Sequence, residues 1–108
     1  MERLDALHDL LAKVKAGGDV YDFGVVGGPT LRGYAEGACV GSLDAAKKLH
    51  EAVLPGWQWQ VWVDHNGMAV AVVDGMEFSS PEVSHHDPSR AWLIAILEAL
   101  IAMEEDKE

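Results

Sequence analysis

Residues 57–73 read Trp-Gln-Trp-Gln-Val-Trp-Val-Asp-His-Asn-Gly-Met-Ala-Val-Ala-Val-Val, and this stretch decides the fold. Aromatic and β-branched residues dominate both of its ends, as is typical of β-strands. Between them lies Asn66-Gly67, a dipeptide favoured in the two-residue turn of a β-hairpin. We therefore predict an antiparallel hairpin over residues 57–73.

A two-residue turn at this place also predicts the register of the hairpin. The expected cross-strand pairs are Val63 with Val70, Trp62 with Ala71, and Val61 with Val72. Both faces of the hairpin are then apolar, and both need cover. The sequence therefore predicts an α+β fold, a small three-layer α-β-α sandwich. Its antiparallel sheet is built on the central hairpin and has helices on both faces.

Helical patterns flank the hairpin on its N-terminal side. Over residues 2–16, leucines and Val14 recur at three- and four-residue steps, and Gly17-Gly18 follows the last turn. Over residues 43–53 a second amphipathic pattern begins after Ser42, a favourable N-cap, and ends before Pro55-Gly56. We predict a helix in each segment.

A third helix is predicted over residues 88–103, with Asp87 as N-cap and Pro88 in its first turn. From residue 91 to residue 103 its one charged residue is Glu98, so it is apolar nearly all round. Such a helix is either central to the core or covered in part by another subunit, and the second alternative is a hypothesis of homodimerisation. Residues 104–108 are interpreted as an acidic tail.

Residues 19–41 have no clear period. Residues 21–26 contain enough aromatic and β-branched side chains for a short strand, but Gly27-Gly28-Pro29 interrupts the chain directly afterwards. We expect irregular structure or short strands here, forming either a mobile flap or a wrap around the core.

Length and charge set limits on function. A chain of 108 residues predicts a single domain over residues 1–108. Its formal net charge of −10 disfavours binding to nucleic acid or to an anionic membrane. The acidic residues are scattered along the chain, but an acidic mimic of DNA remains an alternative. There is no signal-peptide pattern and no apolar run that could span a bilayer, so we predict a cytoplasmic protein of a bacterial host.

The residues that could carry chemistry form no known motif. His85-His86 and the pair Asp64-His65 at the turn could bind a metal ion only if the fold brings them together, since a site needs three or four ligands. The alternative function is therefore a small metal-assisted hydrolase that uses these residues. Neither nucleotide-loop pattern is present, and we predict no cofactor.

Other reactive side chains have simpler explanations. Cys39 is the only cysteine, so no internal disulfide forms, and no base accompanies it in sequence. None of the serines lies in a nucleophile-elbow motif; the candidates are Ser42, Ser79, Ser80, Ser84 and Ser89. The four tryptophans are expected to fill the core, and in the alternative that one or two mark a partner surface, Trp57 is the best candidate. We assign no catalytic, cofactor or metal residues.

One resemblance accompanies these patterns. The run Ser42-Leu43-Asp44-Ala45-Ala46, followed by Leu54-Pro55-Gly56-Trp57-Gln58-Trp59 and by a late helix that begins Pro88-x-x-Ala91, resembles the phage ABA-sandwich domain family. The match covers residues 42 to 103. It implies an α-β-α layered fold and a phage or prophage setting, and it implies no active site.

Taken together, these patterns predict a phage- or prophage-derived accessory protein. We expect it to act by binding an unidentified protein partner or by self-association, without catalysis.

Overall fold

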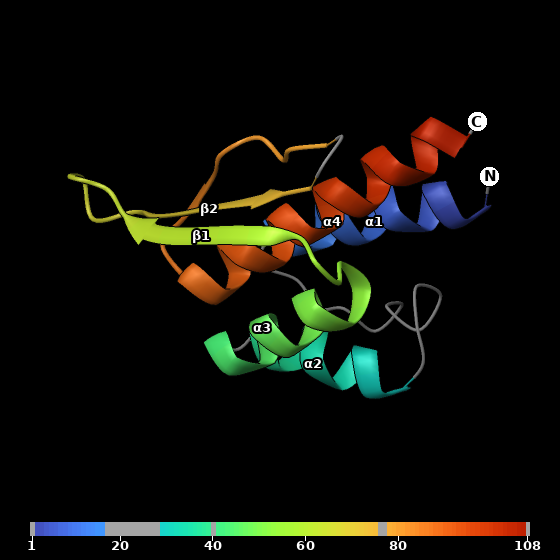
Figure 1. Ribbon diagram of the computed structural model, residues 1–108. Coiled ribbons are helices and arrows are strands. Elements are labelled where there is room, and N and C mark those ends of the chain that lie inside the picture. The colour runs from blue at the N-terminus through green and yellow to red at the C-terminus, as the bar shows by residue number, and fades with distance from the viewer. Residues whose placement is uncertain (1, 17–28, 40, 76–77, 108) are drawn as a thin grey trace.

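The computed structural model describes residues 2–16, 29–39, 41–75 and 78–107. Its elements, shown in Figure 1, are α1 (Glu2–Lys15), α2 (Pro29–Cys39), α3 (Leu43–Val53), β1 (Gln58–Val63), β2 (Ala69–Asp74), β3 (Val83–His85) and α4 (Pro88–Lys107). The strands form one antiparallel sheet in the order β1-β2-β3. The predicted α+β class, with an antiparallel sheet built on the hairpin, is confirmed.

Helix α4 lies at the centre of the molecule. It contacts α1, α2, α3 and all three strands, and in Figure 1 it runs with α1 between the sheet and the α2–α3 pair. Its residues 91–97 are all buried. The apolar character of this helix on nearly every side is therefore explained within one chain. Of the two interpretations given by its sequence, a helix central to the core is confirmed.

The hairpin register differs by one residue from the predicted one. Val63 pairs with Ala69, Trp62 with Val70, and Val61 with Ala71. The reason lies at the turn, where the Asp64 carboxylate accepts hydrogen bonds from the backbone N–H groups of Asn66 and Met68. Gly67 has a positive φ of 83° and donates to the Asp64 carbonyl. Three residues therefore form the loop, with glycine in the left-handed position, instead of the predicted two.

The corrected register changes the two faces of the sheet. Ala69, Ala71 and Val73 are buried on the face that packs against α4, together with Val83 of β3. The other face carries Gln58, Gln60 and Ser84, which are exposed. Because that face is partly polar, it can face water and does not need to be covered by a helix.

The predicted layer order is wrong in this respect. Among the described elements, α4 is the helix with extensive contacts to the strands, and α1, α2 and α3 pack on α4 or on one another. The arrangement is a sheet on one side of α4 and helices around the remainder of it, instead of helices on both faces of the sheet.

The segment expected to be irregular contains a helix. Residues 29–39 form α2, while residues 19–28 lie outside the described part of the chain. Pro29 begins this helix, a position at which the missing N–H of proline costs nothing. Gly37 faces Ala45 of α3 so closely that a Cβ at position 37 would lie 2.7 Å from the Cβ of Ala45. Gly37 therefore marks close packing of α2 against α3, not a break in structure.

Two further boundaries differ from the sequence expectation. The last helix continues to Lys107, so residues 104–107 are helical instead of an acidic tail, since no glycine or proline follows Met103. Strand β3, with three residues, was not predicted. Helices α1 and α3 agree with their predicted segments to within one residue. No helix in the described part of the chain is long and apolar enough to cross a lipid bilayer.

Candidate functional site

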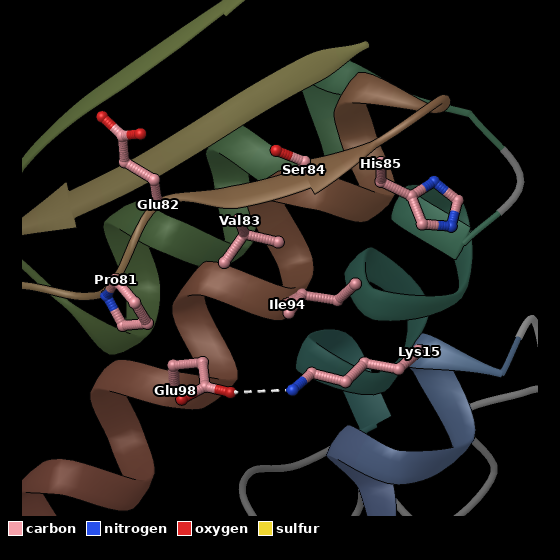
Figure 2. A pocket seen from close by; sticks show the side chains of 8 residues that line it. All are labelled: Lys15, Pro81, Glu82, Val83, Ser84, His85, Ile94 and Glu98. Carbon is pink, nitrogen blue, oxygen red and sulfur yellow. Dashed lines mark ion pairs between the residues drawn. The ribbon is translucent and has the colours of Figure 1, made fainter.

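A groove runs along β3, where this strand and the segment before it lie over α4 and the end of α1. Figure 2 shows one part of it, a cavity of about 330 Å³ with Val83 and Ile94 at its floor. Lys15 and Glu98 form an ion pair across it, with 3.3 Å between Nζ and Oε1. The pair joins the C-terminal end of α1 to the middle of α4.

A second cavity of about 390 Å³ shares Lys15 and His85 with the first and extends to the N-terminal end of α4. The rings of His85 and His86 stack here with 4.3 Å between their centroids. His85 Nδ1 accepts a hydrogen bond from the backbone N–H of Asp87. Burial, followed by the nearby charges of His86 and Arg90, lowers the pKa of His85 below the usual 6.5, and Asp87 opposes this effect.

Arg90, which lines this second cavity, has a structural role. Its two terminal nitrogens donate to the carbonyls of Val14 and Cys39, at 3.1 Å and 2.7 Å, and so hold the C-terminal ends of α1 and α2 against α4. The buried hydroxyl of Ser89 donates to the Ala38 carbonyl at 2.7 Å in the same region. A guanidinium placed at two helix C-termini neutralises their partial negative charge. Arg90 is thus engaged by the protein itself.

Cys39 lines the second cavity together with His85 and His86. In the first cavity, Ser84 and His85 do not form a pair of a nucleophile and a base. Ser84 and His85 are neighbours on β3, and neighbouring strand residues point to opposite faces, as Figure 2 shows for these two side chains. Glu98 is paired with Lys15. In the described part of the molecule, every buried side-chain nitrogen or oxygen has a hydrogen-bond partner, so no orphaned polar atom points into either cavity.

The four residues predicted as a possible metal centre are not brought together. Asp64 and His65 lie at the tip of the β1–β2 hairpin, where the Asp64 carboxylate is occupied by the turn. His85 and His86 lie at the end of β3, beyond β2. Among the described residues, no three His, Cys, Asp or Glu side chains are placed so that they could hold a metal ion.

The candidate nucleophiles also have structural positions. Ser42 caps α3 by accepting from the Ala45 N–H, as predicted. Ser80 is buried and accepts from the Val73 N–H, while Ser89 is held as described above. Cys39 is buried at the end of α2. Ser79, on the segment before β3, and Ser84, within β3, are exposed.

Comparisons with models of known protein families, with curated proteins and with solved structures find no match. The resemblance to the phage ABA-sandwich family therefore stays a prediction.

The exposed apolar side chains concentrate on one strand. Of the four large hydrophobic residues exposed among those described, Trp59 (41%), Trp62 (38%) and Val63 (67%) lie on β1, and Leu43 (45%) lies at the start of α3. Among the described strands, β1 is at the edge of the sheet, so one side of its backbone is not paired with any of them. It contains no charged residue, proline or glycine, the usual means by which proteins protect such edges.

The tryptophans differ in part from the sequence expectation. Trp92 is buried in the core, as predicted, and its ring lies 4.4 Å from that of Trp59. Trp57, the best candidate for a partner surface in the sequence, is half-buried and packs against Gly75. Trp59 and Trp62 are the exposed ones. Their exposure could not be assigned from sequence because it depends on which strand forms the edge of the sheet.

Sequence reasoning also missed His50. This residue of α3 is buried, its Nε2 donates to the Trp57 carbonyl at 3.0 Å, and its Nδ1 accepts from Trp92 Nε1 at 3.3 Å. Burial lowers its pKa below 6.5, against the smaller effects of the Trp57 hydrogen bond and the charge of Glu51. Both ring nitrogens are thus used to connect α3, the start of β1 and α4.

Proposed function

We propose that this chain acts by binding protein through β1, without catalysis. The observation that carries the proposal is the uncharged edge strand Gln58–Val63, which exposes Trp59, Trp62 and Val63. Tryptophan is enriched among residues that dominate binding energy in protein interfaces. An open strand edge also offers backbone donors and acceptors to an added strand, which is a common mode of protein recognition.

The groove beside β3 gives less support to any other function. Lys15 pairs with Glu98, and Arg90 donates to the carbonyls of two helix ends. Among the described residues, no three side chains are placed to hold the metal ion of the alternative metal-assisted hydrolase. The DNA-mimic alternative predicts acids gathered on one face of the protein, and the exposed acids come from several elements, including α1, α3 and the end of α4.

The proposal also includes the biological setting in which this chain binds its partner. The resemblance of residues 42 to 103 to a phage family supports a phage- or prophage-derived accessory protein. The net charge of −10 argues against nucleic acid as the partner. We propose a cytoplasmic location in a bacterial host, where such a partner would be met.

The test is affinity capture with variants of the exposed residues. The tagged protein is used to capture partners from lysate of its own host, grown with and without prophage induction. Val63→Lys places a charge at the edge of β1, and Trp62→Gln removes an exposed ring. Leu43→Lys is the matched control, because Leu43 is also an exposed apolar residue, with an exposure between those of Trp62 and Val63, but lies on α3.

The proposal expects a stoichiometric partner that the wild type and Leu43→Lys retain and that both β1 variants lose. A partner that binds all four proteins equally would show that β1 is not the binding surface. Circular dichroism of each variant confirms that the fold is kept, which is expected since all three side chains are exposed.

A further inference from the structure

The unpaired side of β1 can be identified residue by residue. The backbone N–H of Val73 donates to Ser80 Oγ and its carbonyl accepts from the Ser80 N–H, so both groups of Val73 point away from β1. Val73 is paired with Trp59, so this pair exchanges no ladder hydrogen bond. Hydrogen-bonded and non-hydrogen-bonded pairs alternate along an antiparallel ladder. Trp59, Val61 and Val63 therefore direct their backbone donors and acceptors outward.

The same three residues share a face of the sheet. They pair with Val73, Ala71 and Ala69, which are buried against α4. Trp59 and Val63 are exposed, and Val61 between them is half-buried. The residues with outward-directed backbone groups are thus arranged symmetrically about Val61, with a large apolar residue, Trp59 or Val63, on each side of it.

This symmetry makes the edge complementary to itself. We propose that a second copy of this chain occupies it, with the two β1 strands antiparallel about a two-fold axis at Val61. Val61 then pairs with its own counterpart, Trp59 with Val63 of the other copy, and Gln60 with Trp62 of the other copy. The proposal rests on the function proposed above and names the partner at the same surface.

The pairing agrees with the chemistry of each position. A two-fold axis normal to the sheet keeps both α4 helices on one side and joins two three-stranded sheets into one. Aromatic and β-branched residues directly opposite each other stabilise antiparallel strands. Asp64 would lie opposite Gln58, so no two like charges face each other across the strands. Trp59 and Val63, two of the three exposed apolar residues of β1, would face each other across the pairing.

Pairing over residues 58–64 of each copy makes a small interface, so we expect a concentration-dependent dimer instead of a permanent one. Sedimentation equilibrium of the full chain between about 1 µM and about 500 µM, at about 150 mM salt, should show a monomer–dimer equilibrium in the micromolar range. Val63→Lys should raise the dissociation constant by about tenfold or more, while Leu43→Lys should leave it unchanged. A wild type that stays monomeric throughout this range overturns the proposal.

A cross-link tests the register. In Val61→Cys the two introduced thiols would lie on the axis, within the Cα separation that a disulfide spans. Oxidised glutathione should convert this variant to a covalent dimer. The wild type, whose Cys39 is buried, and the control Leu43→Cys should form no covalent dimer. Equal cross-linking of Leu43→Cys and Val61→Cys would overturn the pairing.

The two proposals fail in different ways. If the wild type is monomeric but Val63→Lys loses a captured protein of different mass, the occupant of β1 is a segment of another chain, and only the second copy is excluded. If neither dimerisation nor capture depends on Val63, protein binding by β1 is excluded as well.

Discussion

At the scale of single residues, His50 is the most constrained polar group of the core. Its Nε2 proton is donated to the Trp57 carbonyl and its Nδ1 lone pair accepts from Trp92, so the neutral ring satisfies both partners. A proton added at Nδ1 would oppose the Trp92 N–H directly. Burial also lowers the pKa of His50 below 6.5, because the charged ring is poorly solvated in the core.

This arrangement predicts a loss of stability in mild acid. The folded chain binds the His50 proton more weakly than the unfolded chain, so the unfolded state takes up more protons as the pH falls through 6.5. The contribution of His50 to the free energy of unfolding is present above that pH and is lost toward the lower pKa of the folded state. Urea unfolding measured from about pH 8 to about pH 5.5 should show this decrease.

His50→Gln removes the titrating ring and should give a flatter pH dependence with lower stability overall. His8→Gln, at an exposed position of α1, serves as control and should retain the dependence of the wild type. An unchanged pH dependence in His50→Gln would contradict the assignment. Part of the dependence should remain in any case, because the pKa of His85 is also lowered.

The hairpin tip predicts a contrast between two adjacent residues. Gly67→Ala forces a Cβ into the left-handed conformation at a φ of 83° and should cost about 1 kcal/mol. Asn66 takes part in the turn through its backbone N–H and has a negative φ, so Asn66→Ala should change the free energy of unfolding by less than about 0.5 kcal/mol. Chemical denaturation of both variants measures the difference. Equal losses would instead support the two-residue turn, in which both positions need a positive φ.

The tip also shows what the sequence can and cannot reveal at this scale. Asn66-Gly67 correctly located the hairpin, and Gly67 does take the left-handed position. The register was wrong because the Asp64 side chain, through two hydrogen bonds to the backbone, stabilises a longer loop that competes with the two-residue turn. Similarly, the caps Ser42 and Asp87 were predictable because capping is local, with Asp87 accepting from the Ser89 N–H.

At the scale of elements, the pairing of α2 with α3 depends on glycine. Gly37 lies where a Cβ would be 2.7 Å from Ala45 Cβ, whereas a Cβ at Gly33, one turn earlier in α2, has nothing within 4 Å. Both positions are helical, and glycine is unfavourable in a helix. The two glycines therefore have different reasons to be present.

This difference predicts opposite effects of one substitution. Gly33→Ala should stabilise the protein by about 0.5–1 kcal/mol, because alanine loses less conformational entropy in a helix. Gly37→Ala has the same gain but must separate α2 from α3, and overpacking of this kind costs about 1–3 kcal/mol. The difference between the two variants in thermal denaturation gives the cost of overpacking, because both variants have the same gain in helix propensity. A stabilising Gly37→Ala would mean that the two helices are not in close contact.

The same glycines explain why α2 was not predicted. Glycine and proline between residues 27 and 41 indicate breaks in a sequence read locally, but here they permit the start of a helix and its close approach to another. Strand β3 was missed because three residues carry no period, and it is held by pairing with β2. Helices α1 and α3 were predictable from their amphipathic patterns alone.

At the scale of the whole molecule, the sequence predicted the α+β class but not the layer order. That order depends on a single helix, α4, which contacts every other described element. Its all-round apolarity indicated burial, but not which elements bury it. The two cavities along β3 could not be predicted at all, because their walls join Lys15 of α1 to residues more than sixty positions later. The exposed edge follows from strand order, which is also a long-range property.

The charge of the molecule leads to a last prediction, on salt. With 18 acidic and 8 basic side chains on one small domain, carboxylates repel one another more strongly in the folded state than in the expanded unfolded chain. The Debye length falls from about 30 Å at 0.01 M to about 8 Å at 0.15 M salt, so added salt should weaken this repulsion. Raising sodium chloride across that range should increase the Tm of the monomer by about 2–4 °C. Differential scanning calorimetry at a concentration low enough to avoid association measures this effect.

The same screening should strengthen pairing of two chains through β1, since each copy carries a net charge of −10. A Tm that falls with salt would show instead that attractive ion pairs such as Lys15–Glu98 outweigh the net repulsion.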